Sequence, residues 1–139
     1  MALLSPDDAV RQARRLLSLP ESGEGVAHLV RRLDRAGADY WLVQVSGHVA
    51  CVEQASAVLA STAQSGNAAV PVTRAQAVER AGLGTDAGAE LVWMACRATL
   101  SMLDPLWAVS RAGRTVYVDQ RGRTWDELQP KPRGGGGAA

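Results

Sequence analysis

Two stretches of this 139-residue chain repeat one another, and that repetition limits the possible fold more than any other feature. Residues 5–13 match residues 73–81 with a shift of 68 positions, and residues 24–54 match a later stretch, without a gap, at a shift of 66. Because two separate segments match in the same order, the sequence predicts a tandem duplication of one supersecondary unit. The identical pairs at the shift of 66 are Glu24/Glu90, Val26/Val92, Arg31/Arg97, Trp41/Trp107, Val43/Val109, Gly47/Gly113, Val52/Val118 and Gln54/Gln120.

Each copy is predicted to begin with a helix. Ser5 and Thr73 are N-cap residues, because a short side-chain oxygen can accept from the free amides of the first helical turn. The first helix should cover residues 6–17, with its apolar residues at helical spacing. The second should cover residues 74–81 and end at Gly82, a residue type that suits the left-handed position after a helix.

Three strands are predicted to follow each helix. Residues 26–33 have helical apolar spacing, but their repeat partner, residues 91–99, is typical of a strand buried on both faces, and the duplication favours strands in both copies. The two later strands are half-buried and are joined by a glycine-containing turn, as in a tight hairpin. These later strands are predicted at residues 40–45 and 49–53 in the first copy and 106–111 and 115–119 in the second.

The pattern predicts the α+β fold class, with two helix-plus-three-stranded antiparallel meander repeats. The two meanders can join into one continuous sheet, with the helices covering one face. Trp41, Val43, Trp107 and Val109 share one side of their strands and should face the helices. The predicted layout is a first repeat at residues 1–60, a linker at 61–72, a second repeat at 73–128 and a flexible Pro/Gly tail at 129–139.

Residues 116–123, Val-Tyr-Val-Asp-Gln-Arg-Gly-Arg, resemble the pattern that ends a PepSY domain, where a strand carrying Tyr-Val-Asp turns at Asp-x-x-Gly. Asp119 can cap that turn through the backbone just after it, and Gly122 can take the left-handed position. The second copy, residues 73–128, resembles the family well. The first copy, residues 5–60, departs from it.

The departures in the first copy lie at the motif itself: Cys51 stands in place of Tyr117, Glu53 in place of Asp119, and Ser56 in place of the turn glycine. PepSY domains are known as propeptide and inhibitory modules of secreted peptidases and as non-catalytic binding domains. The resemblance implies a PepSY/cystatin-like helix packed on a curved sheet, and a non-enzymatic binding or regulatory module.

The residue types that carry catalysis are few. The two histidines are His28 and His48, and His48 lies three residues from Cys51, which places the two on opposite faces of a strand. The sequence has no Cys-x-x-Cys, no His-x-x-x-His and no carboxylate cluster, so it predicts no metal site, no cofactor and no enzyme. Cys51 and Cys96 sit in apolar segments and are expected to be free buried thiols.

Charge and composition suggest where the protein works. The chain starts without a basic or apolar leader and has no run of about 18 apolar residues, so a cytoplasmic location without a membrane span is expected. A net charge of +1 argues against nucleic acid as a partner. Arginine outnumbers lysine 14 to 1, which we interpret as the mark of a GC-rich bacterial genome.

A partner-binding surface is predicted on the second copy. Trp93 lacks a tryptophan at the equivalent position of the first copy, so it either fills the core or anchors an interface. The arginines around the second hairpin form either a solvated rim or a docking surface for an acidic partner. The candidate binding residues are Trp93, Tyr117, Arg111, Arg114, Arg121 and Arg123.

The favoured function is non-catalytic binding, by an accessory or regulatory module that recognises a protein or peptide. Edge strands can accept a peptide by strand addition or pair to make a homodimer. One alternative is a small-molecule-binding protein or enzyme that uses the concave face of the sheet, and another is a structural subunit of a larger assembly. The ionisable pairs Arg31/Glu24 and Arg97/Glu90 recur in both copies and are interpreted as structural salt bridges.

Overall fold

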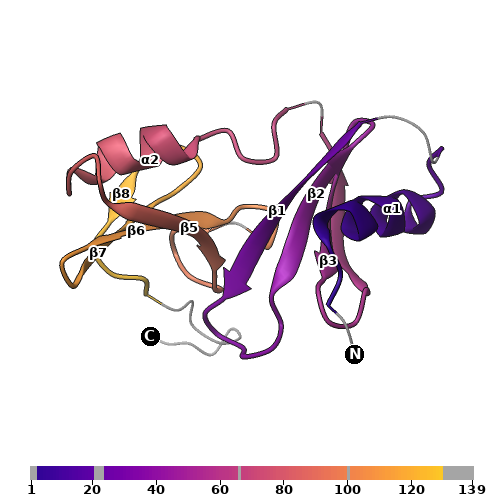
Figure 1. Ribbon diagram of the computed structural model, residues 1–139, viewed down its shortest axis with the longest axis horizontal. Coiled ribbons are helices and arrows are strands. Elements are labelled where there is room, and N and C mark those ends of the chain that lie inside the picture. The colour runs from indigo at the N-terminus through magenta and orange to yellow at the C-terminus, as the bar shows by residue number, and fades with distance from the viewer. Residues whose placement is uncertain (1–2, 21–23, 66, 100, 130–139) are drawn as a thin grey trace, which may run out of the picture.

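A computed structural model describes residues 3–20, 24–65, 67–99 and 101–129. Within these ranges the chain is α+β, with two helices and one eight-stranded mixed sheet (Figure 1). The first half contains α1 (Pro6–Leu16), β1 (Gly25–Arg32), β2 (Tyr40–Val45), β3 (His48–Glu53) and β4 (Leu59–Gln64). The second half contains α2 (Arg74–Ala81), β5 (Gly88–Trp93), β6 (Leu106–Arg111), β7 (Arg114–Val118) and β8 (Thr124–Trp125).

The strands form one sheet in the order β4-β3-β2-β1-β5-β6-β7-β8. Every neighbouring pair is antiparallel except β1 and β5, which are parallel and join the two halves at the centre. The expectation of one continuous sheet is therefore confirmed.

The helix signals in the sequence are confirmed. The Ser5 hydroxyl accepts from the Asp8 amide at 3.1 Å, and Thr73 forms a capping box with Gln76 at the start of α2. Gly82 ends α2 with a φ of 70°, the left-handed conformation expected of a C-cap glycine. α1 ends at Leu16, one residue earlier than predicted, with Leu17 as its C-cap.

The predicted linker at residues 61–72 is partly wrong. Residues 61–64 belong to β4, which pairs antiparallel with β3 at the outer edge of the sheet. Its sequence, Leu-Ala-Ser-Thr-Ala-Gln, is mostly small and polar, with a single β-branched residue and no aromatic side chain, which explains why composition suggested a linker. Residues 130–139 of the predicted tail lie outside the described residues.

The first strands of the two halves correspond at a different shift from the other strands. Leu29 pairs with Trp41 in the first half, and Leu91 pairs with Trp107 in the second. Leu91 is thus the counterpart of Leu29, a shift of 91 − 29 = 62, whereas the tryptophans differ by 107 − 41 = 66. The ungapped match is therefore wrong over this strand, because the connection from β5 to β6 is longer than that from β1 to β2.

This change of register also corrects the predicted salt bridges. Arg31 bonds Glu90 of the opposite half at 2.6 Å, so the ion pair joins the two halves instead of recurring within each. The pairs Glu24/Glu90, Val26/Val92 and Arg31/Arg97, although identical in the sequence, are not structural counterparts.

The two helices cover opposite faces of the sheet, not one face as predicted. Within each half the tryptophan side of the strands does face the helix, since Trp41 packs in a cluster with α1 and Trp107 in a cluster with α2. At the join, Val30 pairs with Leu91. Residues paired in a ladder point to the same face, so Val30 and Leu91 share a face of the sheet. For β1 this is the face away from α1, and for β5 it is the face that α2 covers, so the two helices lie on opposite faces.

The parallel join explains this arrangement. β1 and β5 are parallel, and the strands of the two halves follow outward from them in opposite directions across the sheet. Superposing one half on the other therefore requires a two-fold axis that runs along the strands in the plane of the sheet. Such an axis keeps strand direction and exchanges the two faces, so two helices related by it must lie on opposite sides.

Each half therefore has a sheet face that its own helix does not cover. Behind β2 and β3, the buried side chains of Tyr40 and Cys51 pack with Met102 and Leu103, from the β5–β6 connection. The Tyr40 hydroxyl donates to the Met102 carbonyl at 2.6 Å. Behind the second half, the covering side chains are Leu33, Met94, Tyr117, Trp125 and Leu128.

Candidate functional site

The six residues predicted to bind a partner do not form one surface. Arg111 and Arg114 pair at the β6–β7 turn, whereas Arg121 and Arg123 follow the opposite end of β7. A five-residue strand at about 3.3 Å per residue separates these ends by roughly 16 Å. The predicted arginine rim is therefore two separate pairs.

Two of these arginines already have structural partners. Arg111 bonds Asp86 at 3.1 Å and the Leu83 carbonyl at 2.8 Å. Arg121 bonds Asp104 at 3.1 Å, Asp119 at 3.3 Å and the Ala98 carbonyl at 2.9 Å. These contacts fix loops to the sheet and leave less of each guanidinium for a partner.

The two aromatic candidates lie on opposite faces. Trp93 is 8% exposed and packs on the α2 side, with the Arg32 guanidinium 5.0 Å from its ring centroid. Its indole nitrogen is buried without a hydrogen-bond partner among the described residues. Tyr117 lies on the other face, in the cluster with Trp125. Trp93 therefore fills the core, as the alternative interpretation held.

The Asp119 turn has the geometry expected from the motif. The buried carboxylate accepts from the backbone amides of Arg121 and Arg123, each at 2.9 Å, and from the Trp125 indole at 3.0 Å. Gly122 has a φ of 84°. This constellation fixes β8 to the turn that follows β7, so it stabilises the fold.

Burial shields both cysteine thiols from solvent. Cys51 and Cys96 are free and buried, and desolvation raises the pKa of Cys51 to about 12. A thiol that stays protonated is a poor nucleophile. No group of three or more His, Cys, Asp or Glu side chains suited to a metal ion occurs in the described part of the chain.

The buried thiols give a prediction. In native protein near pH 8, both cysteines are expected to react with a disulfide reagent at least about 100-fold more slowly than in denaturant, because reaction requires opening of the core. Following the absorbance of the released thiolate measures this. A single-cysteine variant, Cys96→Ala, isolates Cys51. Rapid reaction of native Cys51 would contradict its burial and raised pKa.

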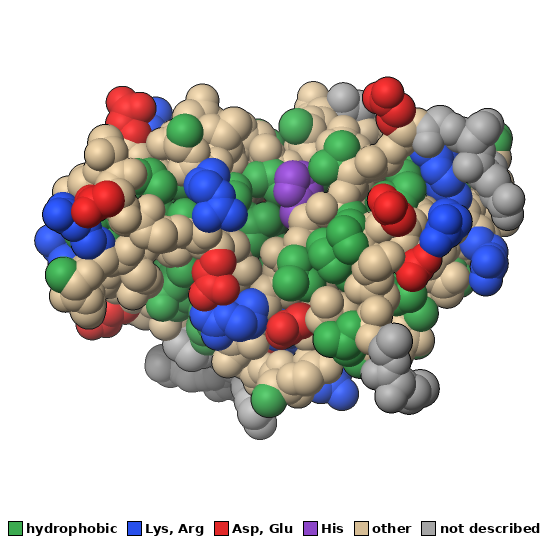
Figure 2. Space-filling view, in the orientation of Figure 1, with side chains coloured by type: hydrophobic (Ala, Val, Ile, Leu, Met, Phe, Trp, Pro, Cys, Tyr) green, Lys and Arg blue, Asp and Glu red, His purple; other side chains and the backbone are tan. Residues whose placement is uncertain are grey.

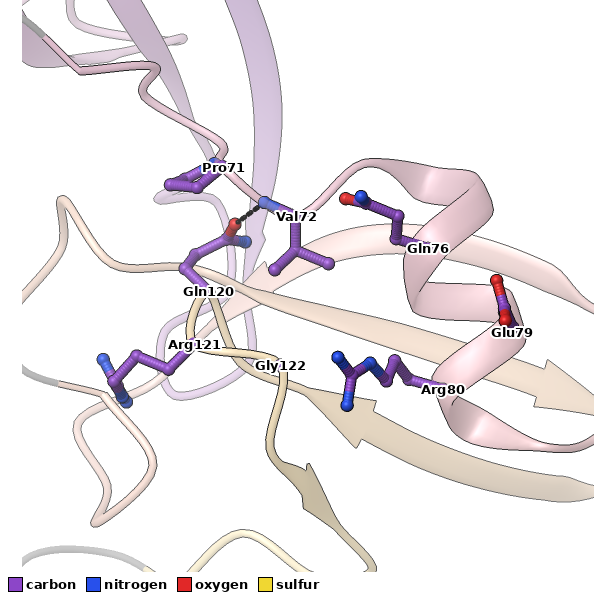
Figure 3. A pocket seen from close by; sticks show the side chains of 8 residues that line it. All are labelled: Pro71, Val72, Gln76, Glu79, Arg80, Gln120, Arg121 and Gly122. Atoms are coloured by element: carbon purple, nitrogen blue, oxygen red, sulfur yellow. Dashed lines mark hydrogen bonds between the residues drawn. The ribbon is translucent and has the colours of Figure 1, made fainter.

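A polar hollow of about 760 Å³ lies between α2 and the turn after β7 (Figure 3). The Gln120 side chain accepts from the Val72 amide at 3.0 Å and fixes one wall. Arg80 points toward Gly122, whereas Arg121 points away from the hollow (Figure 3). Among the labelled side chains, a single cation thus faces inward, without the convergent polar groups that a small-molecule site needs.

A second opening lies at the centre of the sheet, where β1 and β5 separate. Their ladder covers three pairs, from Val30–Leu91 to Arg32–Trp93. Residues 25–29 of β1 pair with β2 along one edge of the strand. Along the other edge, which faces β5, these residues lie outside the ladder. Figure 1 shows the two strands diverging from their paired ends. We call the space between residues 25–29 of β1 and residues 88–90 of β5 the wedge.

The wedge holds a cavity of about 430 Å³. Its lining comes from both halves: Ala27, His28, Leu29, Arg31, Asp39, Arg74, Glu90, Leu91 and Trp107. In the space-filling view, a histidine lies among hydrophobic side chains near the centre of the face, with arginine and acidic side chains nearby (Figure 2).

Backbone groups of β1 point into the wedge. The Leu33 amide donates to the Trp93 carbonyl at 2.9 Å, so Leu33 directs its backbone toward β5. Because successive residues of a strand direct these groups to alternate sides, Ala27 and Leu29 direct theirs toward the wedge. On the other side of the wedge, the Ala89 carbonyl accepts from the Arg74 guanidinium.

Exposed apolar side chains flank this open edge. Val26 is 51% exposed and Leu29 is 44% exposed, and the alternation of the strand places them on opposite faces. Burial lowers the pKa of His28, so its imidazole is neutral at pH 7. Arg74 lies 5.4 Å from the Trp107 ring centroid, and Arg31 is neutralised by Glu90. The wedge therefore combines an unpaired strand edge with a mixed wall, in which apolar side chains lie beside two arginines, two carboxylates and a histidine.

Comparisons of the chain with models of known families, with curated proteins and with solved structures find no match. Among the described residues, no helix is both long and apolar enough to cross a membrane.

The sequence did not single out Val26, Leu29 or Arg74. One signal was present in the sequence. Val26 and Leu29 lie three residues apart, so in a strand their apolar side chains face opposite sides, whereas a strand that is buried on one face needs apolar residues on that face only. The signal could be interpreted only from the structure, which shows that residues 25–29 of β1 are unpaired along the edge toward β5.

Proposed function

We propose that the protein is a non-catalytic binding or regulatory module, made of two PepSY-like repeats, that takes up an extended peptide segment of a partner protein in the wedge. The observation that carries the proposal is the open edge of β1 at residues 25–29, flanked by exposed Val26 and Leu29. The PepSY resemblance of residues 73–128 supports a binding role. The two free buried cysteines support a cytoplasmic location, where thiols stay reduced.

The chemistry of the wedge defines the segment that fits. Backbone groups of Ala27 and Leu29 can extend the ladder to an added strand, which supplies affinity with little dependence on sequence. Side chains of the added strand alternate between the faces, so they meet Leu29 on one face and Val26 with His28 on the other. Because Val26 and Leu29 are exposed and apolar, and Arg31 is already paired with Glu90, the best ligand is apolar at the positions that meet Val26 and Leu29.

The test uses seven-residue peptides selected from a random library on the full chain. Ala27→Pro removes the N–H that faces the wedge and leaves the bonds to β2, so it should weaken the selected peptides about tenfold or more, equivalent to about 1.4 kcal/mol. Leu29→Glu should have a similar effect, because it replaces an exposed apolar contact of the open edge with a charge. Isothermal titration measures both affinities.

The matched control is Thr62→Pro, which makes the same change at the outer edge of the sheet and should leave peptide affinity unchanged. Circular dichroism verifies that each variant is folded. Equal affinity for wild type, Ala27→Pro and Leu29→Glu would show that the peptides bind elsewhere and would overturn the wedge as the site.

A second candidate function is small-molecule binding in the same wedge. The cavity of about 430 Å³ falls within the roughly 300–1,000 Å³ range of ligand sites, and His28, Arg74 and Glu90 line it. A thermal-shift screen of small carboxylates, amines and aromatic metabolites distinguishes the two. Stabilisation by such a compound, lost in Leu29→Glu, together with failure of peptide selection, would favour this candidate.

A further inference from the structure

β4 forms one outer edge of the sheet, with β3 on its inner side. The Ser65 amide donates to the Gly47 carbonyl at 2.8 Å, so Ser65 directs its backbone toward the β2–β3 hairpin. By alternation along the strand, Ala63 also faces β3, and Thr62 and Gln64 direct their N–H and C=O groups outward. The outer edge thus presents backbone donors and acceptors in strand geometry.

This edge lacks the features that prevent pairing. Leu59–Gln64 contains no charged residue and no proline, the two side-chain devices that commonly block an exposed strand edge. Its one irregularity lies at the start of the strand, where the register with β3 shifts between Cys51 and Val52. The opposite end of the sheet is β8, a strand of two residues, which offers little to pair with.

Exposed apolar side chains lie beside the start of β4. Val58 is 54% exposed and its carbonyl accepts from the Glu53 amide, while Leu3 is 59% exposed and precedes Leu4, whose amide donates to the Gln54 carbonyl. Because Glu53 and Gln54 are adjacent, Val58 and Leu4 are fixed to the same end of the β3–β4 hairpin. A partner strand along β4 would extend toward this apolar end.

We propose that β4 is a self-association edge, at which two copies of the chain pair antiparallel about a two-fold axis. In the register that places Thr62 of one copy opposite Thr62 of the other, Ala60 meets Gln64, and no like charges oppose one another. The Thr62 hydroxyl already donates to the Val49 carbonyl of its own copy at 3.0 Å, so the pairing depends on the outward backbone groups of the two strands. A two-fold contact must be self-complementary, and an uncharged edge of small residues meets that requirement. The pairing continues the sheet from one copy into the next.

The test is the mass in solution. Sedimentation equilibrium of the full chain at about 100 µM should give twice the chain mass of 14.6 kDa. Thr62→Lys places two like charges at the two-fold axis and should weaken dimerisation at least about tenfold. Thr62→Glu should do the same. An equimolar mixture of the two variants should recover the dimer, because lysine then faces glutamate.

A wild-type monomer at this concentration would overturn the proposal, as would Thr62→Lys that dimerises as tightly as wild type. The proposal does not depend on the wedge. Ala27→Pro, which disables the wedge edge, should remain a dimer, so loss of peptide binding and loss of self-association can be told apart.

Discussion

Replacing Asp119 with alanine is expected to lower the free energy of unfolding by about 3–5 kcal/mol, a loss comparable to that of removing one partner from a buried ion pair. The carboxylate is fully buried and accepts from two backbone amides and the Trp125 indole. Alanine would leave these three donors, and the Arg121 guanidinium at 3.3 Å, without their acceptor. A donor that is shielded from water and has no acceptor in the protein has nothing to replace the hydrogen bonds it made with water. Denaturant titration measures the change, and Tm should fall by roughly 10 °C or more.

Glu53 provides the matched control, because it precedes Asp119 by 119 − 53 = 66 positions and occupies the corresponding place in the first half. Its carboxylate is partly exposed and accepts from the Ser56 hydroxyl at 2.8 Å. Glu53→Ala should therefore cost about 1 kcal/mol or less. Equal losses from the two substitutions would show that the Asp119 turn is not a special source of stability.

Replacing Arg14 with methionine is expected to cost about 2–4 kcal/mol, although the replacement is apolar and of similar length. Arg14 is 1% exposed and donates to the Glu24 carbonyl at 2.6 Å, the Ser46 hydroxyl at 3.1 Å and the Pro20 carbonyl at 3.2 Å. This one side chain thus joins Pro20, after α1, and Glu24, before β1, to the β2–β3 turn. Methionine fills the space but donates to none of the three oxygens.

The neighbouring Arg15→Met is the control, since Arg15 is an exposed residue of the same helix. Its loss should be within about 0.5 kcal/mol, as for most surface changes. Arg14→Lys should fall between the two, because one ammonium cannot reach acceptors in three directions as the guanidinium does. A stable Arg14→Met would show that these bonds are replaced by water.

The parts of the fold that depend on local chemistry could be predicted from the sequence. N-cap side chains at Ser5 and Thr73, the C-cap at Gly82 and the hairpin glycines report the backbone conformation of their own neighbourhood. The helix bounds and the strands at residues 40–45 and 106–111 followed from these signals. The Asp119 turn followed likewise, because its donors lie within six residues.

The features that depend on contacts between segments distant in the sequence could not be predicted. The shift in β1 and β5 is set by pairing with Trp41 and Trp107, which an ungapped match of the sequence does not register. The positions of α1 and α2 depend on whether the halves join through parallel or antiparallel strands. The wedge exists because that join is three pairs long, and no residue type in β1 encodes the length of its ladder with β5.

The covering of the first half by a segment of the second half has a consequence for synthesis. The first half leaves the ribosome with strands β1 to β4 complete. Tyr40 and Cys51, on the face away from α1, then still lack the side chains that cover them in the folded protein. The segment that covers them, around Met102, is made some sixty residues after Tyr40. Stable packing of the first-made half therefore waits for the second, and the nascent chain exposes an apolar sheet face until then.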